Sequence, residues 1–261
     1  KKEIVSLLPK QKRGSKIKVP KYMIINAILY KLKTGCQWRQ LPMKSLFGYR
    51  KYSWKSVYHH FRKWAKEGFW LQLWQKLLAK HKHLLDLSSI QLDGSHSMAK
   101  RGGEQVAYQG RKKGKTTNML ILTDAQGIPV SSSKAIAGNH NDAFELTTHF
   151  EFMLADMRKA KLNTEDLFMN ADAGFDTEEF RETCYKNNIM GNIAKNKRNG
   201  NEEKTCYTIF DEKLYAFRYV IERTNAWIDA YKNLLVRFDT CSKSWEAWNH
   251  IAFSIILIRK L

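Results

Sequence analysis

The sequence predicts an α/β protein, with a mixed β-sheet flanked by helices and preceded by a small all-helical domain. Up to about residue 85, apolar residues recur at helical spacing, whereas from residue 87 onward short strand-like apolar runs alternate with helical stretches. Charge follows the same division. Residues 1–66 hold 18 basic residues and one acidic residue, and the remaining residues hold 27 basic and 24 acidic.

The charge distribution also indicates a partner. The chain has 261 residues and a formal net charge of +20, most of it carried by its first quarter. Cations gathered in one segment are typical of proteins that bind the phosphate backbone of nucleic acids. Solvated surface lysines are the structural alternative, but these would be expected to spread along the chain.

Residues 1–86 are predicted to form a helical, helix-turn-helix-like DNA-binding domain. The first of its helices ends at Gly35, and the second begins after the N-cap Ser53 and ends before Gly68. A third amphipathic helix covers about 69–85. A plain helical bundle would explain the aromatic residues but not the basic face of the second helix. Four residues on that face are predicted to contact DNA: Lys55, His59, Arg62 and Lys63.

Residues 87–261 are predicted to form the second domain. Strands are expected in the segments SSIQLDGSH, TTNMLILTDA, IPVSSSKAIA, DLFMNA and IMGNIA. Helices are expected in GNHNDAFELTTHFEFMLADMRK, in TEEFRETCYKNN, from Asp211 to about Phe238, and in EAWNHIAFSIILIRKL. Three strands, a helix, a strand, a helix, a strand and a terminal helix is the order of a ribonuclease-H-like mixed five-stranded sheet.

Three acidic residues occupy positions from which carboxylates would converge. Asp93 ends the first strand and Asp172 follows the fourth, and these strands are neighbours in a sheet of this order. Glu222 lies in the late helix, on one stripe with Tyr215 and Arg218. Carboxylates suit Mg²⁺, and two such ions can hold the attacking and leaving oxygens of phosphodiester cleavage. A surface ion pair between Arg218 and Glu222 is the structural alternative.

Other acidic residues near these positions are predicted to have structural roles. Asp142 with Glu145, and Asp176 with Glu179, each have the spacing of a capping box at the start of a helix. Asp124, in TDAQG, is predicted to begin a turn. Of the two aspartates in DAGFD, the first is therefore predicted to be a ligand and the second a cap.

Several short motifs in the second domain occur together. They are LDGSH, GNHND, DAGF, and Tyr215, Arg218 and Glu222 at the spacing Y-x2-R-x3-E, followed by ERTNAWIDAYKNL. These motifs resemble those of the DDE transposases of the IS4/IS5 superfamily, and more narrowly the IS5-type enzymes of bacterial insertion sequences. The resemblance implies that Tyr215 and Arg218 hold the DNA strand. Many relatives have a Lys or Arg where this chain has Asp229, and Lys232 is the nearby cation expected to make that DNA contact.

The resemblance implies a DNA transposase that binds terminal inverted repeats, cleaves the ends by metal-dependent hydrolysis and joins the 3′-OH to target DNA. Asp93, Asp172 and Glu222 would be the catalytic residues and would hold two Mg²⁺ ions, with Mn²⁺ as a substitute. His96 is a further residue that could approach the scissile phosphate. The implied partners are double-stranded DNA and a second copy in a homodimer or higher synaptic assembly. Two alternative functions remain: a ribonuclease-H-like nuclease without strand transfer, and a DNA-binding repressor derived from a transposase.

Hydropathy and cysteine spacing bear on the compartment. No apolar run approaches the roughly 20 residues that a membrane span requires, and no signal peptide is visible. The four cysteines are widely spaced and form no CxxC motif, which is typical of reduced thiols. We therefore expect a cytoplasmic, nucleoid-associated protein.

Overall fold

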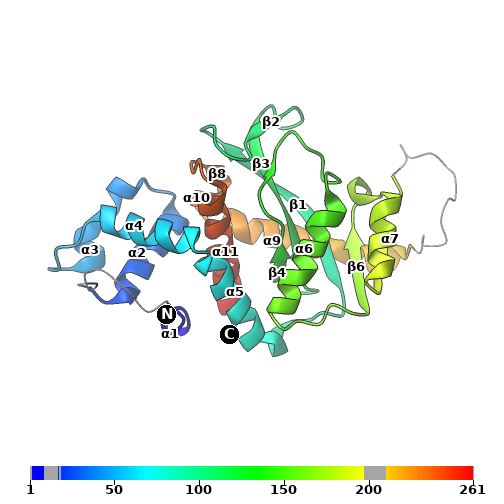
Figure 1. Ribbon diagram of the computed structural model, residues 1–261, viewed down its shortest axis with the longest axis horizontal. Coiled ribbons are helices and arrows are strands. Elements are labelled where there is room, and N and C mark those ends of the chain that lie inside the picture. The colour runs from blue at the N-terminus through cyan, green and yellow to red at the C-terminus, as the bar shows by residue number, and fades with distance from the viewer. Residues whose placement is uncertain (1, 9–16, 18, 197–209, 261) are drawn as a thin grey trace.

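The computed structural model describes residues 2–8, 17, 19–196 and 210–260. A group of helices at one side and a mixed sheet at the other are joined by the central helix α11 (Ser242–Ile258) (Figure 1). Within the described residues the sheet contains eight strands: β1 (Ile90–Ala99), β2 (Ala107–Gln109), β3 (Gly114–Thr123), β4 (Pro129–Ser132), β5 (Ile136–Ala137), β6 (Leu167–Ala171), β7 (Ile189–Ile193) and β8 (Val236–Arg237).

The strand order confirms the predicted ribonuclease-H-like α/β fold. β1 pairs antiparallel with β3 and parallel with β6, β4 pairs antiparallel with β3, and β7 pairs parallel with β6. The predicted number of five strands is wrong for the sheet as a whole, because β2, β5 and β8 add to it. The predicted third strand, IPVSSSKAIA, is divided into β4 and β5. Strands β2 and β8, of three and two residues, are too short to give a strand pattern in the sequence.

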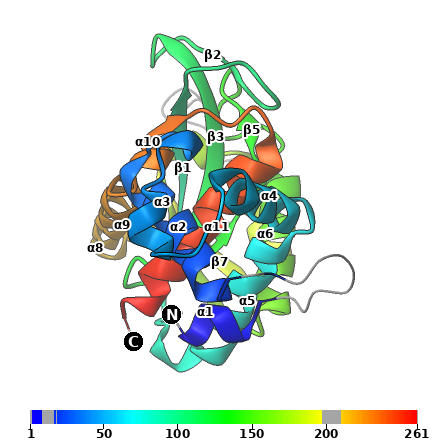
Figure 2. The same cartoon turned by 90° about the vertical axis from the view of Figure 1, so that its left-hand side faces the viewer.

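Helices cover both faces of the sheet, with α6 on one side of β1 and β3 and α9 on the other (Figures 1 and 2). The α-helices before α11 are α1 (Lys2–Ser6), α2 (Lys21–Thr34), α3 (Met43–Phe47), α4 (Trp54–Lys66), α5 (Phe69–Lys80), α6 (Leu146–Lys159), α7 (Glu178–Lys186), α8 (Glu212–Tyr215), α9 (Val220–Asp229) and α10 (Lys232–Leu235). The 3₁₀ turns among the described residues are η1 (Trp38–Gln40), η2 (Lys82–Leu84), η3 (Ala173–Phe175) and η5 (Ala216–Tyr219). No helix in the described ranges is long and apolar enough to cross a membrane.

The helix boundaries at the N-terminal side largely follow the local signals. Gly35, with φ of 67°, ends α2 in the left-handed conformation that glycine adopts without strain. Ser53 caps α4, because its Oγ accepts a hydrogen bond of 3.1 Å from the N–H of Lys55. The third helix starts as predicted but is shorter, since α5 ends at Lys80 and η2 follows.

Helix α11 packs against both parts of the chain. The ring of Trp248 stacks on Phe61 of α4 with centroids 4.0 Å apart, and Phe253 lies 5.0 Å from Trp74 of α5. One hydrophobic cluster contains these residues together with strands β1, β3 and β6. The division into residues 1–86 and 87–261 stays a prediction. The two segments share a core through α11.

Both predicted capping boxes are wrong. Helix α6 follows Glu145, which has a φ of 46° and makes no capping hydrogen bond with its side chain. Helix α7 is capped by Thr177. The carboxylates of Asp142 and Asp176 instead bind other side chains, so they are not available to the helix termini.

The long late helix is also shorter than predicted. The helical run covers residues 212–229, contains the 3₁₀ turn η5, and is followed by the short helix α10 and the strand β8. Residues 236–237 form the strand β8, and not part of a helix, because Val236 pairs with Met98 of β1. A contact between residues so far apart in the sequence has no local signature.

Because the side chain of His250 is buried, we predict that the free energy of unfolding depends on pH. It is buried in α11, where its ring stacks on Trp74 at 5.6 Å, and burial lowers its pKa from 6.5 to about 3. Between these pKa values the unfolded chain binds a proton that the folded chain does not. The free energy of unfolding is therefore unaffected by the titration of His250 above about pH 6.5. Between about pH 6.5 and pH 3 it falls by about 1.4 kcal/mol for each pH unit of acidification. In urea denaturation, His250→Leu should flatten this decline, and an unchanged pH dependence would refute the assignment.

Candidate active site

Asp93 lies where the pairing of β1 with β6 ends. Strand β1 was predicted to end at Asp93 but continues to Ala99 through its pairings with β3 and β8. Its pairing with β6 covers only residues 90–92, so Asp93 is the first residue beyond the shared segment. The half-buried side chain of Asp93 is thus held on a rigid strand beside an opening in the sheet.

Asp172 occupies the matching position on β6. Leu92 pairs with Ala171, so Asp93 and Asp172 each follow a member of the last pair between two parallel strands. Asp172 also precedes η3, and its Oδ1 accepts a hydrogen bond of 2.7 Å from the N–H of Gly174. The fold therefore brings these two predicted residues to one point at the edge of the sheet.

The electrostatics of Asp93 reflect this crowding of acids. The pKa of Asp93 is raised to about 6, chiefly by burial and then by the charges of Asp172 and Asp142. The hydrogen bond from the backbone N–H of Gly94 and the charge of Arg218 act in the opposite direction. Nearby carboxylates that oppose ionisation form a site of negative potential. Such a site favours a bound cation.

Glu222 lies on α9 and is exposed. Asn225, three residues later on that helix, donates a hydrogen bond of 3.3 Å from Nδ2 to Oδ2 of Asp93. Residues three apart share a helix face, so Glu222 is on the side of α9 that faces β1. Across the described ranges, however, no three His, Cys, Asp or Glu side chains lie close enough to hold a metal ion. The structure joins Asp93 to Asp172 but leaves Glu222 apart from them.

Tyr215 and Arg218 lie next to each other before α9. The guanidinium of Arg218 lies 5.6 Å from the centre of the Tyr215 ring, and its charge lowers the pKa of Asp93. No ion pair joins Arg218 to Glu222 among the residues described, which disfavours the structural alternative. Arg218 is therefore a cation beside the acidic site. Asp229, at the end of α9, is exposed.

Asp142 is a residue of this site that the sequence did not predict. Its Oδ1 accepts a hydrogen bond of 2.8 Å from Nδ2 of Asn118 and lies 4.0 Å from Nε2 of His96. A Cβ atom on Gly94 would lie 2.4 Å from the same oxygen, so only glycine permits this approach. The glycine directly after Asp93 is the sequence signal that could have indicated a close neighbour.

His96 and Asp124 are both held within the fold. The side chain of His96 is 7% exposed and its Nδ1 lies 3.2 Å from Oγ1 of Thr116, which disfavours an approach to a phosphate. Asp124 is buried and accepts hydrogen bonds from three backbone N–H groups, those of Asp86, Gln126 and Ile128. The predicted turn at Asp124 is confirmed.

The cations predicted to bind DNA outside the acidic site lie in two places. The side chains of Lys55, His59, Arg62 and Lys63 are all exposed on α4. Lys232 is exposed at the start of α10, where its backbone carbonyl carbon would lie 3.2 Å from a Cβ on Gly35. Lys232 is thus at the junction between α2 and the late helices, away from the basic face of α4.

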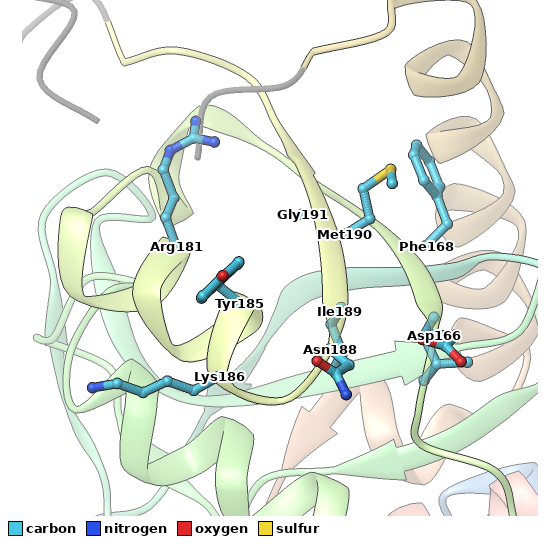
Figure 3. Close-up of a pocket in the computed structure, with 10 residues that line it drawn as sticks. Asp166, Phe168, Arg181, Tyr185, Lys186, Asn188, Ile189, Met190 and Gly191 are labelled. Carbon is cyan, nitrogen blue, oxygen red and sulfur yellow. The ribbon is translucent and has the colours of Figure 1, made fainter. Parts of the chain in front are cut away.

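A hollow of about 750 Å³ lies elsewhere, between α7 and the edge strand β7. In Figure 3, Tyr185 and Lys186 of α7 lie on one side of it and Met190 of β7 on the other. Phe168 also lines it, near the start of β6, whereas Asp172 follows the end of that strand. None of the predicted catalytic residues lines this hollow, so it is separate from the acidic site.

Comparisons with solved structures and curated proteins give distant similarities. The structure titled "Mos1 transposase paired-end complex with left transposon end" aligns with 97% of this chain and 82% of that chain, at 10% identity and a TM-score of 0.31. The "Putative transposase for insertion sequence element IS402" of Burkholderia cepacia is 29% identical over 121 residues, 46% of this chain. The match spans 52% of that relative, or about half its length.

A second protein of Burkholderia cepacia, "Insertion element IS402 uncharacterized 16.2 kDa protein", is 29% identical over 99 residues, which are 37% of this chain and 65% of that protein. Two family models match the chain. Residues 2–74 match the family described as "Putative transposase of IS4/5 family". Residues 85–257, about two thirds of the chain, match the family described as "DDE superfamily endonuclease".

Proposed function

Because the chain belongs to the DDE superfamily endonuclease family, we propose that it is a DNA transposase of the IS4/IS5 type. The proposed activity is metal-dependent cleavage of DNA at the terminal inverted repeats of an insertion sequence, followed by joining of the 3′-OH to target DNA. The observation that carries the proposal is the position of Asp93 and Asp172 directly after the last paired residues of two parallel strands. The family match at residues 2–74 supports it.

The proposed catalytic residues are Asp93, Asp172 and Glu222, which would hold two Mg²⁺ ions, or Mn²⁺ in their place. All three offer carboxylate oxygens, the ligands that these hard cations prefer. Besides burial, the charges of Asp172 and Asp142 help to raise the pKa of Asp93, and such acidic neighbours fit a cation site. Exposed Glu222 can change rotamer without repacking of the core. When bound, the ions would neutralise charge on the scissile phosphate and lower the pKa of a bound water.

Neighbouring groups hold the carboxylates in place. Asn225 donates to Oδ2 of Asp93, and the N–H of Gly174 donates to Oδ1 of Asp172. Both hydrogen bonds fix the direction of a carboxylate before any substrate arrives. Arg218, stacked beside Tyr215, is proposed to bind a phosphate of the DNA strand next to Asp93.

Double-stranded DNA is the proposed partner, both as transposon end and as target. Lys55, His59, Arg62 and Lys63 on α4, and Lys232 on α10, are the proposed contacts outside the acidic site. Two transposon ends must be brought together, so we also propose a homodimer or a higher synaptic assembly. A protein that acts on chromosomal DNA would work in the cytoplasm, next to the nucleoid.

A cleavage assay tests the function. A duplex carrying the inverted repeats that flank the gene is incubated with Mg²⁺ and either the unaltered protein or Asp93→Asn. We expect single-strand nicks at the repeat ends with the unaltered protein, and a loss of about a thousandfold with the variant, since one ligand of the cation site is neutralised.

The products distinguish the other candidates. Nicks that are never joined to a second duplex would indicate a nuclease without strand transfer. DNA binding with no nick under any metal would indicate a repressor. Nicking that survives Asp93→Asn would contradict the proposed site.

A further inference from the structure

A groove of about 650 Å³ separates α4 from the start of α11. The residues of this α4–α11 groove that bear on the argument are Arg62, Lys63 and Lys66 of α4, Lys243 and Ser244 of α11, and Glu104 in the loop between β1 and β2. The groove is therefore lined both by the N-terminal helices and by segments that belong to the sheet and its covering helix.

The groove is strongly basic. Four cations, Arg62, Lys63, Lys66 and Lys243, line it, and all are exposed. None of them forms an ion pair with an acidic side chain in the part of the chain that is described. Uncompensated cations that face one another across a groove repel each other and favour a polyanion between them.

The single carboxylate that lines the groove is already engaged. Glu104 Oε2 accepts hydrogen bonds from the backbone N–H of Ser242 at 3.0 Å and from its Oγ at 2.9 Å, so it caps the first turn of α11. Arg237 donates to the backbone carbonyl of Glu104 at 2.8 Å and fixes this wall. An anionic ligand in the groove would consequently be held by side-chain cations and not by the helix terminus.

A stripe of basic residues on α4 leads into the groove, and its length matches that of a short stretch of a nucleic-acid strand. Along α4, the residues Lys55, His59, Arg62 and Lys66 recur at intervals of three or four and share one face. At 1.5 Å per residue the stripe spans about 16 Å, the axial rise of about five nucleotides of one DNA strand. A second copy of this chain, with its own charge of +20, does not complement such a surface.

We propose that the α4–α11 groove binds the phosphate backbone of DNA, with Lys66 on one wall and Lys243 on the other. This proposal rests on the part of the proposed function that has the chain bind DNA, and it does not require that the chain cleave DNA. Glu104 follows β1, whose six steps from Asp93 to Ala99 already span about 20 Å. The groove therefore holds DNA that flanks the acidic site, and one DNA segment is gripped by the helical part and by the sheet part together.

Binding of a labelled duplex over a series of salt concentrations tests the groove. Lys66→Ala and Lys243→Ala are each expected to weaken binding about 3- to 10-fold and to lower the slope of log K against log salt by about one. Lys76→Ala is the matched control, because Lys76 is exposed on α5 outside the groove, and it should bind like the unaltered protein. Glu104→Gln keeps an oxygen for Ser242 but loses the charge, and should tighten binding about threefold.

Lys55→Ala, on α4 outside the groove, separates this proposal from the proposed function. If Lys55→Ala weakens binding while Lys66→Ala and Lys243→Ala match Lys76→Ala, the groove is refuted and the DNA-binding face of α4 stands. If the groove variants bind weakly while no protein nicks DNA, the groove stands and the transposase proposal fails. If Lys243→Ala spares DNA binding but weakens binding of polyglutamate, the groove takes an acidic protein segment instead. Equal thermal midpoints would exclude misfolding of the variants.

Discussion

Asp172→Asn is expected to lower Mg²⁺-dependent nicking by about a thousandfold and to leave the free energy of unfolding almost unchanged. The loss follows from the neutralised carboxylate, since an amide oxygen is a poorer ligand for a hard cation and no longer balances its charge. The fold should persist because the amide oxygen of asparagine can still accept the hydrogen bond from the N–H of Gly174. Single-turnover cleavage of inverted-repeat DNA and urea denaturation measure the two quantities.

Asn225→Ala provides a graded comparison for this prediction. It removes the donor to Asp93 without changing any charge, so nicking should fall by about tenfold, far less than in Asp172→Asn. If Asp172→Asn were instead as active as the unaltered protein, Asp172 would have no part in holding the cation. If it unfolded the protein, its role would be structural.

Asp176→Ala is expected to cost about 3 kcal/mol of stability. Asp176 forms a 2.8 Å ion pair with Arg181, whose side chain is only 5% exposed, and Oδ2 of Asp176 accepts a hydrogen bond from the N–H of Asn196. Removing the carboxylate leaves the buried guanidinium without its ion-pair partner, while its bond to the carbonyl of Ile193 persists. Urea denaturation at neutral pH would measure the change. Nicking per folded molecule should stay unchanged.

Thr177→Ala is the matched control for Asp176→Ala. Thr177 is the residue that caps α7, through a hydrogen bond of 3.2 Å from the N–H of Phe180 to its Oγ1. Loss of a cap typically costs about 1 kcal/mol. Should Asp176→Ala cost no more than Thr177→Ala, the buried ion pair would contribute no more to stability than an ordinary cap does.

Signals that act over a few residues predicted much of the fold. Ser53 and Gly35 set helix ends through hydrogen bonds and backbone angles that depend on their own residue type. The order of strands and helices followed from short apolar runs, as expected for strands covered on both faces, and from helical periodicity between them. The adjacent positions of Asp93 and Asp172 were predictable for the same reason, because the order of the strands makes them neighbours.

Contacts between distant segments were not predictable in this way. Asp142 has the local pattern of a cap, yet its carboxylate reaches Asn118 because Gly94 leaves room for it. Likewise, the carboxylate of Asp176 forms an ion pair with the buried guanidinium of Arg181 and does not cap a helix. In both cases a stronger partner, brought close by the packing of the fold, outweighs a local preference of about 1 kcal/mol. The separation of Glu222 from the aspartates also depends on how α9 lies across the sheet.

The central position of α11 has a consequence for biosynthesis. Residues 242–258 supply Trp248 to α4 and Phe253 to α5, yet a ribosome makes them after every other helix and strand of the described structure. Until they emerge from the exit tunnel, α4 and α5 lack the aromatic contacts with Trp248 and Phe253. The proposed DNA-binding face of α4 therefore gains these contacts only after the strands that carry Asp93 and Asp172 have been translated.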